Sequence, residues 1–295
     1  MTALHDLELT ELSERLHRRE LSPVELAEHT IERIVEHDER HHAFVEVTRD
    51  RALAEARQAE RELARGESRG PLHGIPYAAK DLFDVSGEPT GAGTHLLANN
   101  VADADATVVR RLRDAGMVLL GKTHTVQFAY GGVGINHDTG TPRNPWRQDE
   151  PYVPGGSSSG SAVAVAAGLA PVALGTDTSG SVRIPASLCG LTGLKTTVGR
   201  VSRAGVYPLS RTLDSIGPLA HSAAGCALVY EAIQGADAGD PTTYGQLPHD
   251  VTSALDEGIA GMRFAFIDTM FFDDADPAVV DAVRATEEAF RSLGA

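Results

Sequence analysis

The sequence predicts an α/β fold in which helices pack around a central sheet. Helical patterns fill most of residues 8–65, and short apolar segments then alternate with further helical ones. Hydrophobic residues make up 42% of the 295 residues, which is ample for a core. The length fits one large α/β domain or two ordinary ones.

The composition also excludes several function classes. A net charge of −15 argues against binding nucleic acid directly, because neutralising phosphates needs clustered Lys and Arg. The charged N-terminus lacks the apolar segment of a signal peptide, and the longest weakly polar run, 162–175, is too short to span a bilayer. Cys189 and Cys226 lie in apolar surroundings without CxxC spacing, which indicates reduced core thiols. We therefore expect a cytoplasmic protein without a membrane partner.

Residues 1–66 are expected to form a helical layer packed on the core. Helices are predicted over 8–19, 23–39 and 50–65, and the last one stops at Gly66. The segment from Ser22 to Glu25 has the form of a capping box with Pro at the first helical position. The second helix is predicted to bury one face, formed by Leu26, Thr30, Ile31, Ile34 and Val35.

A buried strand is predicted next, over Gly74 to Asp81, and Lys80 stands at its end. Lysine is rarely fully buried without a partner. From this context alone, Lys80 is either a structural lysine paired with a carboxylate or a catalytic group. The later predicted elements are a helix at 107–115, strands at 117–120, near Ile216 and at Met262–Ile267, and helices at 223–233 and 277–293, the last burying Val279, Val280, Val283 and Phe290.

The most informative stretch runs from Pro154 to Thr197. Two Ser/Gly clusters, Gly155–Ser161 and Thr178–Ser181, flank an apolar segment at Ala162–Leu174. Glycine lets backbone N–H groups point inward, and a helix that starts after the first cluster would place its positive end beside the serines. This pattern is suited to a nucleophilic hydroxyl and an anion-stabilising pocket.

Two common motifs match by letter and are rejected. Gly116–Thr123 fits the P-loop pattern, but its four middle residues are apolar and follow a helix-ending glycine, so they predict a buried strand. Gly156–Gly160 fits G-x-S-x-G with Ser158 as the nucleophile. That fold needs a strand running into the turn, and the preceding polar, proline-rich segment does not predict one.

The stretch resembles the signature of the amidase signature family, serine hydrolases of carboxylic amides with a Ser-Ser-Lys triad. The matching motifs are GGSSSGS at Gly155–Ser161 and the turn at Ser179–Pro185, and the likeness extends over about residues 70–220. By this resemblance Ser181 is the acyl-forming nucleophile, Ser157 the bridging serine and Lys80 the base. The resemblance implies a mixed central sheet flanked by helices, with residues 67–295 as the core.

The resemblance also implies how the site is supported. Backbone N–H groups of Thr178, Ser179 and Gly180 are expected to hold the oxyanion, and the peptide bond before Ser157 is expected to be cis. The supporting residues are Ser158, which hydrogen-bonds within the site, and Asp177 and Arg183, which brace the turn. We expect a small-molecule amide as substrate, no cofactor and no metal, and leave a homodimer open.

The sequence departs from the family pattern at two positions and in length. Ser179 stands where the family has glycine, and a Cβ there is tolerated only if the backbone φ is not positive. Thr196 stands where proline is common. Family members are substantially longer, so we expect that the C-terminal part of the family domain is missing and that the sheet is incomplete.

Three functions remain open at this point. The first is a stand-alone amidase, and the second is the glutamine-hydrolysing A subunit of a tRNA-dependent amidotransferase, which shares all three catalytic positions. That branch typically reads KTNMDEF where this chain has the segment Lys122–Phe128, so the stand-alone enzyme is favoured. The third is a truncated, inactive or partner-dependent protein. Residues 123–144 are expected to form a pocket wall with Phe128, Tyr130 and Gly131–Gly134 on the substrate side.

Overall fold

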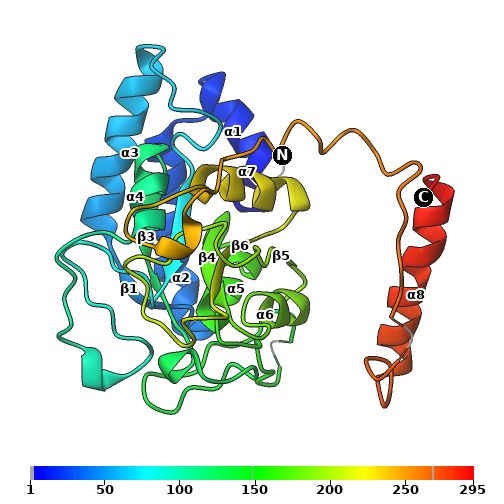
Figure 1. The fold of residues 1–295 in the computed structure, drawn as a ribbon. Helices are drawn as coiled ribbons and strands as arrows, with labels where there is room; N and C mark the ends of the chain where they lie inside the picture. Colours follow the sequence, from blue (N-terminus) through cyan, green and yellow to red (C-terminus); the bar gives the residue numbers. More distant parts are fainter. Residues whose placement is uncertain (1–2, 148, 268) are drawn as a thin grey trace. The chain divides into compact units, whose positions relative to one another are not determined.

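The computed structural model describes residues 3–147, 149–267 and 269–295. The chain divides into two compact units, Met1–His249 and Asp250–Ala295. The first unit holds every strand that the structure describes, together with helices α1 to α7 (Figure 1).

The first unit is built on a mixed sheet in the order β1-β3-β2-β4-β6-β5. Strand β2 runs parallel to β3 and β4, whereas the pairs β1/β3, β4/β6 and β5/β6 are antiparallel. The predicted mixed α/β fold is therefore confirmed. The strands are β1 (Phe44–Val47), β2 (Pro76–Lys80), β3 (Val118–Thr123), β4 (Val172–Asp177), β5 (Thr192–Gly193) and β6 (Ser215–Ala220).

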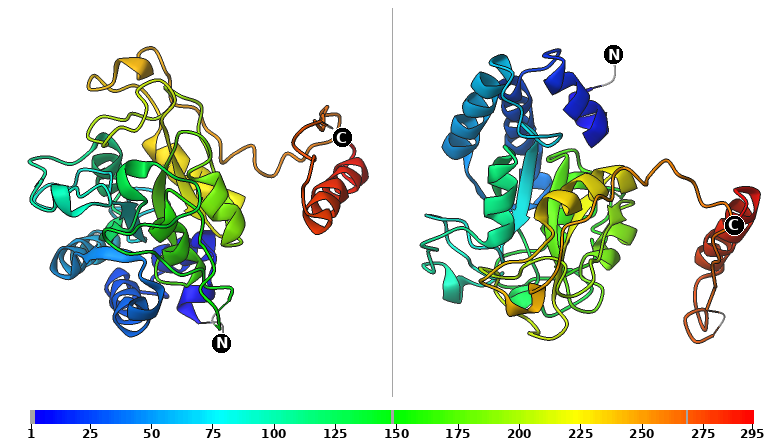
Figure 2. Two further views of the ribbon diagram at one scale, coloured as in Figure 1. Left: turned by 90° about the horizontal axis from the view of Figure 1, so that it is seen from below. Right: turned by 45° about the horizontal axis from the view of Figure 1, so that its top comes forward.

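Helices cover both faces of the sheet, as Figure 1 and the two further views of Figure 2 show. One apolar core lies mainly under α1, α4 and α7, and the other lies mainly under α2, α3, α5 and α6. The α-helices are α1 (Leu9–His17), α2 (Pro23–His41), α3 (Arg49–Ala64), α4 (Thr107–Asp114), α5 (Ser159–Ala166), α6 (Arg183–Leu188), α7 (Ala223–Ile233) and α8 (Pro277–Ser292). Four 3-10 turns lie at Leu4–Asp6, His95–Leu97, Gln127–Ala129 and Pro241–Thr243.

The N-terminal helices follow their sequence signals closely. Ser22 Oγ accepts hydrogen bonds from the N–H groups of Val24 and Glu25, so α2 begins with the predicted N-cap followed by proline. The predicted buried face of α2 is confirmed apart from Val35, which is 72% exposed. At about 100° per residue, Val35 lies about 180° around the helix from Leu26, at the far edge of the buried stripe.

The topology brings the ends of three strands to one edge of the sheet. Strands β2, β3 and β4 are parallel, so their carboxyl ends meet there. Lys80 is in register with Thr123, and Ala78 and Ala79 of β2 pair with Ala173 and Leu174 of β4. Functional groups of an open α/β sheet commonly gather at such an edge.

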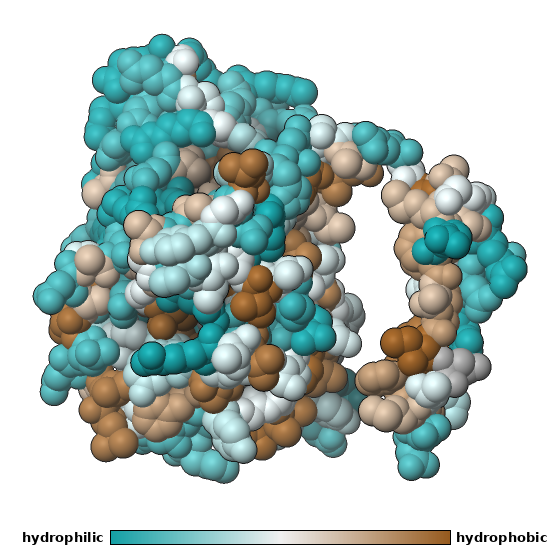
Figure 3. All heavy atoms as spheres, in the orientation of Figure 1, coloured by the Kyte–Doolittle hydropathy of each residue, from teal (hydrophilic) through white to brown (hydrophobic). Residues whose placement is uncertain are grey.

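The second unit differs from its sequence prediction. The helix over 277–293 forms as α8, but it buries none of its residues, and Val279 is 58% exposed. Residues 262–267 form no strand. Figure 3 shows apolar side chains at the surface of this unit. A strand needs a hydrogen-bonded neighbour, and none pairs with residues 262–267 among the described residues. The apolar face of α8 is covered only in part, by contacts of Phe290 with Phe264 and Phe266.

Candidate active site

Lys80 lies at the carboxyl end of β2 with its side chain fully buried at 0% exposure. Its Nζ is 2.8 Å from Ser157 Oγ and 2.8 Å from Thr176 Oγ1. Burial lowers the pKa of Lys80 to about 7, against the opposing effect of the carboxylates of Asp177 and Asp214. A substantial fraction of this amine is therefore unprotonated at neutral pH and able to accept a proton.

Ser157 is held in place mainly through its main chain. The Gly156–Ser157 peptide bond is cis, as the resemblance predicts. The Ser157 carbonyl accepts hydrogen bonds from the Val126 N–H at 3.1 Å and the Thr125 hydroxyl at 3.0 Å. These contacts fix the position of Ser157, which contacts Lys80 although it lies 77 residues later in the sequence.

Helix α5, which follows the serines, approaches the sheet at a glycine. The Gly160 N–H donates to the His124 carbonyl at 3.0 Å. A Cβ at position 160 would come within 2.4 Å of the Ala43 carbonyl oxygen and the His124 nitrogen. Only glycine allows this approach, so Gly160, the last glycine of the first Ser/Gly cluster, sets the depth at which Ser157 enters the site.

Ser181 lies in the turn after β4, and the Asp177 carboxylate braces that turn. Asp177 is fully buried and accepts hydrogen bonds from Gly180 N–H at 2.7 Å and Val182 N–H at 3.1 Å. Arg183 binds both carboxylate oxygens, with distances of 3.0 and 2.9 Å. Burial acts to raise the pKa of Asp177, but the hydrogen bonds from Arg183, Val182 and Gly180 together lower it. The carboxylate therefore stays charged and holds the turn.

The turn also bears on the three expected oxyanion donors. The Gly180 N–H already donates to Asp177, so it is not available for an oxyanion in this structure. Within the described residues, the N–H groups of Thr178, Ser179 and Ser181 donate to no protein acceptor. Ser179 is not among the described residues with positive φ, whereas Gly180 has φ 129°. The serine in place of glycine is thus accommodated without backbone strain.

Ser158 links the two serine turns. Its N–H donates to the Ser181 carbonyl at 3.2 Å, and its hydroxyl lies 3.3 Å from both the N and the O of Thr176. The turns of Ser157 and Ser181 are therefore neighbours. The Ser181 side chain is 8% exposed, and among the described residues its hydroxyl makes no hydrogen bond.

Sequence reasoning missed two residues that lie beside Lys80 and the turn of Ser181. Thr176 is the second partner of Lys80 Nζ, and Asp214 accepts a hydrogen bond from the Thr178 hydroxyl. Both line a cavity of about 450 Å³, whose walls include the side chains of Val206, Pro208, Arg211 and Ile216. Thr176 immediately precedes Asp177 in β4, and alternation along the strand points the two side chains to opposite faces. No local sequence signal identifies Asp214.

The segment that matches the P-loop pattern forms part of a buried strand. Strand β3 runs through Gly121, Lys122 and Thr123, so no P-loop forms. Lys122 instead pairs with Asp81 at 2.8 Å, and both side chains are buried. In the predicted pocket wall, Tyr130 is 82% exposed.

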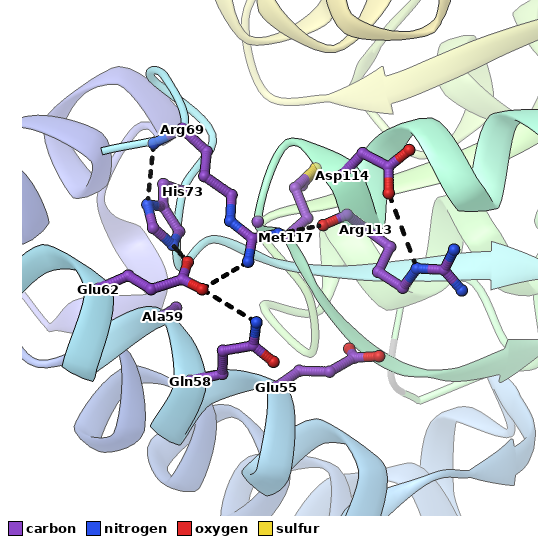
Figure 4. A pocket seen from close by; sticks show the side chains of 10 residues that line it. Glu55, Gln58, Ala59, Glu62, Arg69, His73, Arg113, Asp114 and Met117 are labelled. Carbon is purple, nitrogen blue, oxygen red and sulfur yellow. Dashed lines mark hydrogen bonds and ion pairs between the residues drawn. The ribbon is translucent and has the colours of Figure 1, made fainter. Parts of the chain in front are cut away.

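A second cavity, of about 250 Å³, lies beside α3 and α4 and shares no lining residue with this cluster (Figure 4). His73 Nδ1 accepts the Arg69 N–H at 3.1 Å, and the opposite ring nitrogen, Nε2, lies 3.0 Å from Glu62 Oε2. The Arg69 hydrogen bond is the main cause that lowers the pKa of Glu62, to about 2. These charges neutralise one another, which indicates a structural network.

None of the helices in the described residues is long and apolar enough to span a membrane. A family model described as "Amidase" matches residues 25–295. The A subunit of the glutamyl-tRNA(Gln) amidotransferase of Chromohalobacter salexigens is 45% identical over 292 residues, which cover 99% of this chain and 60% of the relative. The corresponding protein of Thermobifida fusca is 42% identical, with 100% and 59% covered.

Solved structures show the same likeness. The native peptide amidase of Stenotrophomonas maltophilia has a TM-score of 0.89 and 39% identity, covering 98% of this chain and 61% of that one. The A subunit of the glutamyl-tRNA(Gln) amidotransferase of Thermotoga maritima gives a TM-score of 0.84 and 32% identity, covering 100% and 61%. The chain thus spans about 60% of the length of the curated relatives it matches. Because the family model covers most of the chain and agrees with the fold and the motifs, this protein belongs to the amidase family.

Proposed function

We propose that the protein hydrolyses a carboxylic amide through an acyl-enzyme on Ser181, with Ser157 as the proton bridge and Lys80 as the base. The observation that carries the proposal is the buried contact of 2.8 Å between Lys80 Nζ and Ser157 Oγ. Burial lowers the pKa of this amine to about 7, which suits a base at neutral pH. A serine hydroxyl needs such a base to act as a nucleophile.

The first half of the reaction forms the acyl-enzyme. Ser181 Oγ turns toward Ser157 and gives it a proton as it attacks the amide carbonyl carbon, while Ser157 passes its own proton to neutral Lys80. The new C–O bond leaves an oxyanion, which the N–H groups of Thr178, Ser179 and Ser181 stabilise. The proton returns through Ser157 to the amide nitrogen, the C–N bond breaks, and ammonia or an amine leaves.

The second half regenerates the enzyme. Water attacks the acyl-enzyme carbonyl and gives its proton to the same relay, which returns it to Ser181 Oγ as the ester bond breaks. The products are a carboxylic acid and free enzyme. Asp177 and Arg183 touch no reacting atom in this scheme and act by holding the turn.

The curated relatives favour a second candidate of the same chemistry. They are named as A subunits of glutamyl-tRNA(Gln) amidotransferase, which would make glutamine the amide and glutamyl-tRNA(Gln), bound with the help of partner subunits, the acceptor of ammonia. The structure described as a native peptide amidase, at 39% identity, supports the first candidate. Ammonia release from simple amides by the chain alone separates the two.

A third candidate is a catalytically inactive or partner-dependent protein. It is motivated by the coverage of about 60% of the relatives and by the unit Asp250–Ala295, whose helix buries no residue. Such a protein would keep the Lys80–Ser157 contact as an inherited arrangement without turnover.

The test is an amide panel assayed on the purified chain beside Ser181→Ala, together with labelling by an active-serine phosphonate probe. The proposal predicts ammonia release from at least one amide and labelling of Ser181, both absent in Ser181→Ala. Labelling without turnover of any amide supports partner dependence. A chain that is neither labelled nor active contradicts the proposed chemistry.

A further inference from the structure

Asp214 lies opposite Thr178, just beyond the paired part of β4 and β6. The antiparallel register pairs Thr176 with Ile216 and Asp177 with Ser215, so the next pair along is Thr178 and Asp214. The Ser215 hydroxyl closes the ladder by donating to the Asp177 carbonyl at 3.0 Å. The start of β6 is therefore fixed against the end of β4, where the turn to Ser181 begins.

The two oxygens of the Asp214 carboxylate have different partners. Oδ1 accepts the hydroxyl of Thr178, and Oδ2 accepts the N–H groups of Leu209 and Ser210, each at 2.9 Å. Arg203 donates to the main-chain carbonyl of Asp214 at 3.4 Å. One carboxylate thus ties the loop before β6 to the first residue of the nucleophile turn.

We propose that Asp214 is a positioning residue that locks the nucleophile turn through the Thr178 side chain. This inference rests on the proposed function, in which the N–H of Thr178 is an oxyanion donor. Asp177 already holds the later part of the turn, at Gly180 and Val182. Asp214 holds its beginning, so the unbonded N–H groups of Thr178 and Ser179 lie between two anchored points.

The charge of Asp214 also acts on the base. Among the charged groups near Lys80, the carboxylates of Asp177 and Asp214 favour its protonated form and so raise its pKa, against the larger effect of burial. Asp177 is paired with Arg183, Asp81 on the adjoining residue is paired with Lys122, and α5 carries no charged residue. Removing the Asp214 charge should therefore favour the neutral amine.

These two effects can be separated by a pair of variants. Thr178→Val removes the hydrogen bond and keeps the charge, whereas Asp214→Asn removes the charge at nearly constant size. Both should lower kcat about 10- to 100-fold with little change in KM, the range expected for losing a hydrogen bond to a charged group. Only Asp214→Asn should move the acid limb of the kcat/KM profile to lower pH. Thr178→Ser should restore activity.

A control and a second readout keep the inference testable apart from the proposed function. Asp240→Asn alters another carboxylate of the same cavity, one that pairs with Arg203, and should leave the acid limb in place. Hydrogen exchange of the Gly180 N–H, the hydrogen-bonded amide of this turn, should be faster in Asp214→Asn and Thr178→Val than in wild type or Asp240→Asn. If wild type is no more active than Ser181→Ala, the proposed function fails and hydrogen exchange alone decides the inference.

Three results would overturn the inference. They are wild-type kcat in both variants, an acid limb in Asp214→Asn that coincides with that of Thr178→Val, and unchanged exchange of the Gly180 N–H. A merely structural role would lower the amount of folded protein in every variant without moving the acid limb.

Discussion

Lys80 on β2 and Lys122 on the neighbouring strand β3 are both fully buried, and their partners differ. Lys80 Nζ meets two hydroxyls, those of Ser157 and Thr176. Lys122 Nζ meets the carboxylate of Asp81 at 2.8 Å. One strand therefore presents an amine without a paired carboxylate, and the other presents a closed ion pair.

The difference teaches that burial alone does not identify a base. A buried ammonium is stabilised by a contacting carboxylate, which compensates for the lost hydration. Hydroxyls give no such compensation, so the burial of Lys80 favours the neutral amine. The paired-lysine interpretation that sequence context allowed for Lys80 describes Lys122 instead. The partner of a buried lysine, more than its depth, indicates its role.

The largest expected effect comes from removing Lys80, the proposed base. Lys80→Met should lower kcat about 10²- to 10⁴-fold, the usual contribution of general acid–base catalysis. The protein should stay folded, because no contacting carboxylate loses a partner. Steady-state kinetics on any amide that wild type hydrolyses, with thermal unfolding as the control, measures both. Near-normal kcat in a folded Lys80→Met variant would contradict the role of Lys80 as the base.

Lys122→Met should instead act on stability. It leaves the Asp81 carboxylate buried and unpaired, which should lower the free energy of unfolding by about 3–5 kcal/mol. Denaturant unfolding provides the measurement. The double variant with Asp81→Asn should recover part of the loss, since both charges are then gone. Equal instability of the single and double variants would contradict the ion-pair interpretation.

The pH dependence of stability sharpens the comparison further. The pKa of Lys80 is lowered from its ordinary value of 10.5 to about 7 in the folded protein. Between these values the unfolded chain binds a proton that the folded chain does not, so the free energy of unfolding should rise with pH. The rise is at most about 1.4 kcal/mol per pH unit. Urea unfolding of wild type and Lys80→Met at pH 7, 8 and 9 tests it, and a constant difference would count against the shift.

The smallest expected effect is at the second partner of Lys80. Thr176→Val removes one hydroxyl from Nζ while keeping the shape of the side chain. A neutral hydrogen bond contributes about 0.5–1.5 kcal/mol, so kcat/KM should fall about 2- to 10-fold. Serine at this position should retain most of the activity. A loss as large as that of Lys80→Met would show that Thr176 does more than orient the amine.

Much of the fold was predictable because local signals and packing agree. The helices of the first unit follow capping and apolar periodicity, as the Ser22 cap and the buried face of α2 show. The site residues Lys80 and Ser157 lie in contact because each is carried by a motif of fixed local shape. The resemblance supplied their pairing, which spacing alone does not give.

The remaining features of the fold and the site depend on contacts that local sequence patterns do not predict. Asp214 meets Thr178 only through the register of β4 and β6, which no local pattern specifies. The N–H of Gly180 is taken by Asp177, a detail of turn geometry. Residues 262–267 have strand composition without a strand, because pairing requires a neighbour that composition does not supply.

Gly160 brings the main chain of α5 against those of His124, which follows β3, and Ala43, which precedes β1, with no side chain between them. The spacing between the strand ends and the serine loop is therefore set at this point by a main-chain contact. A single methyl group at position 160 would push the serine loop outward. The absence of a Cβ atom at position 160 therefore helps to set the distance between Lys80 and Ser157.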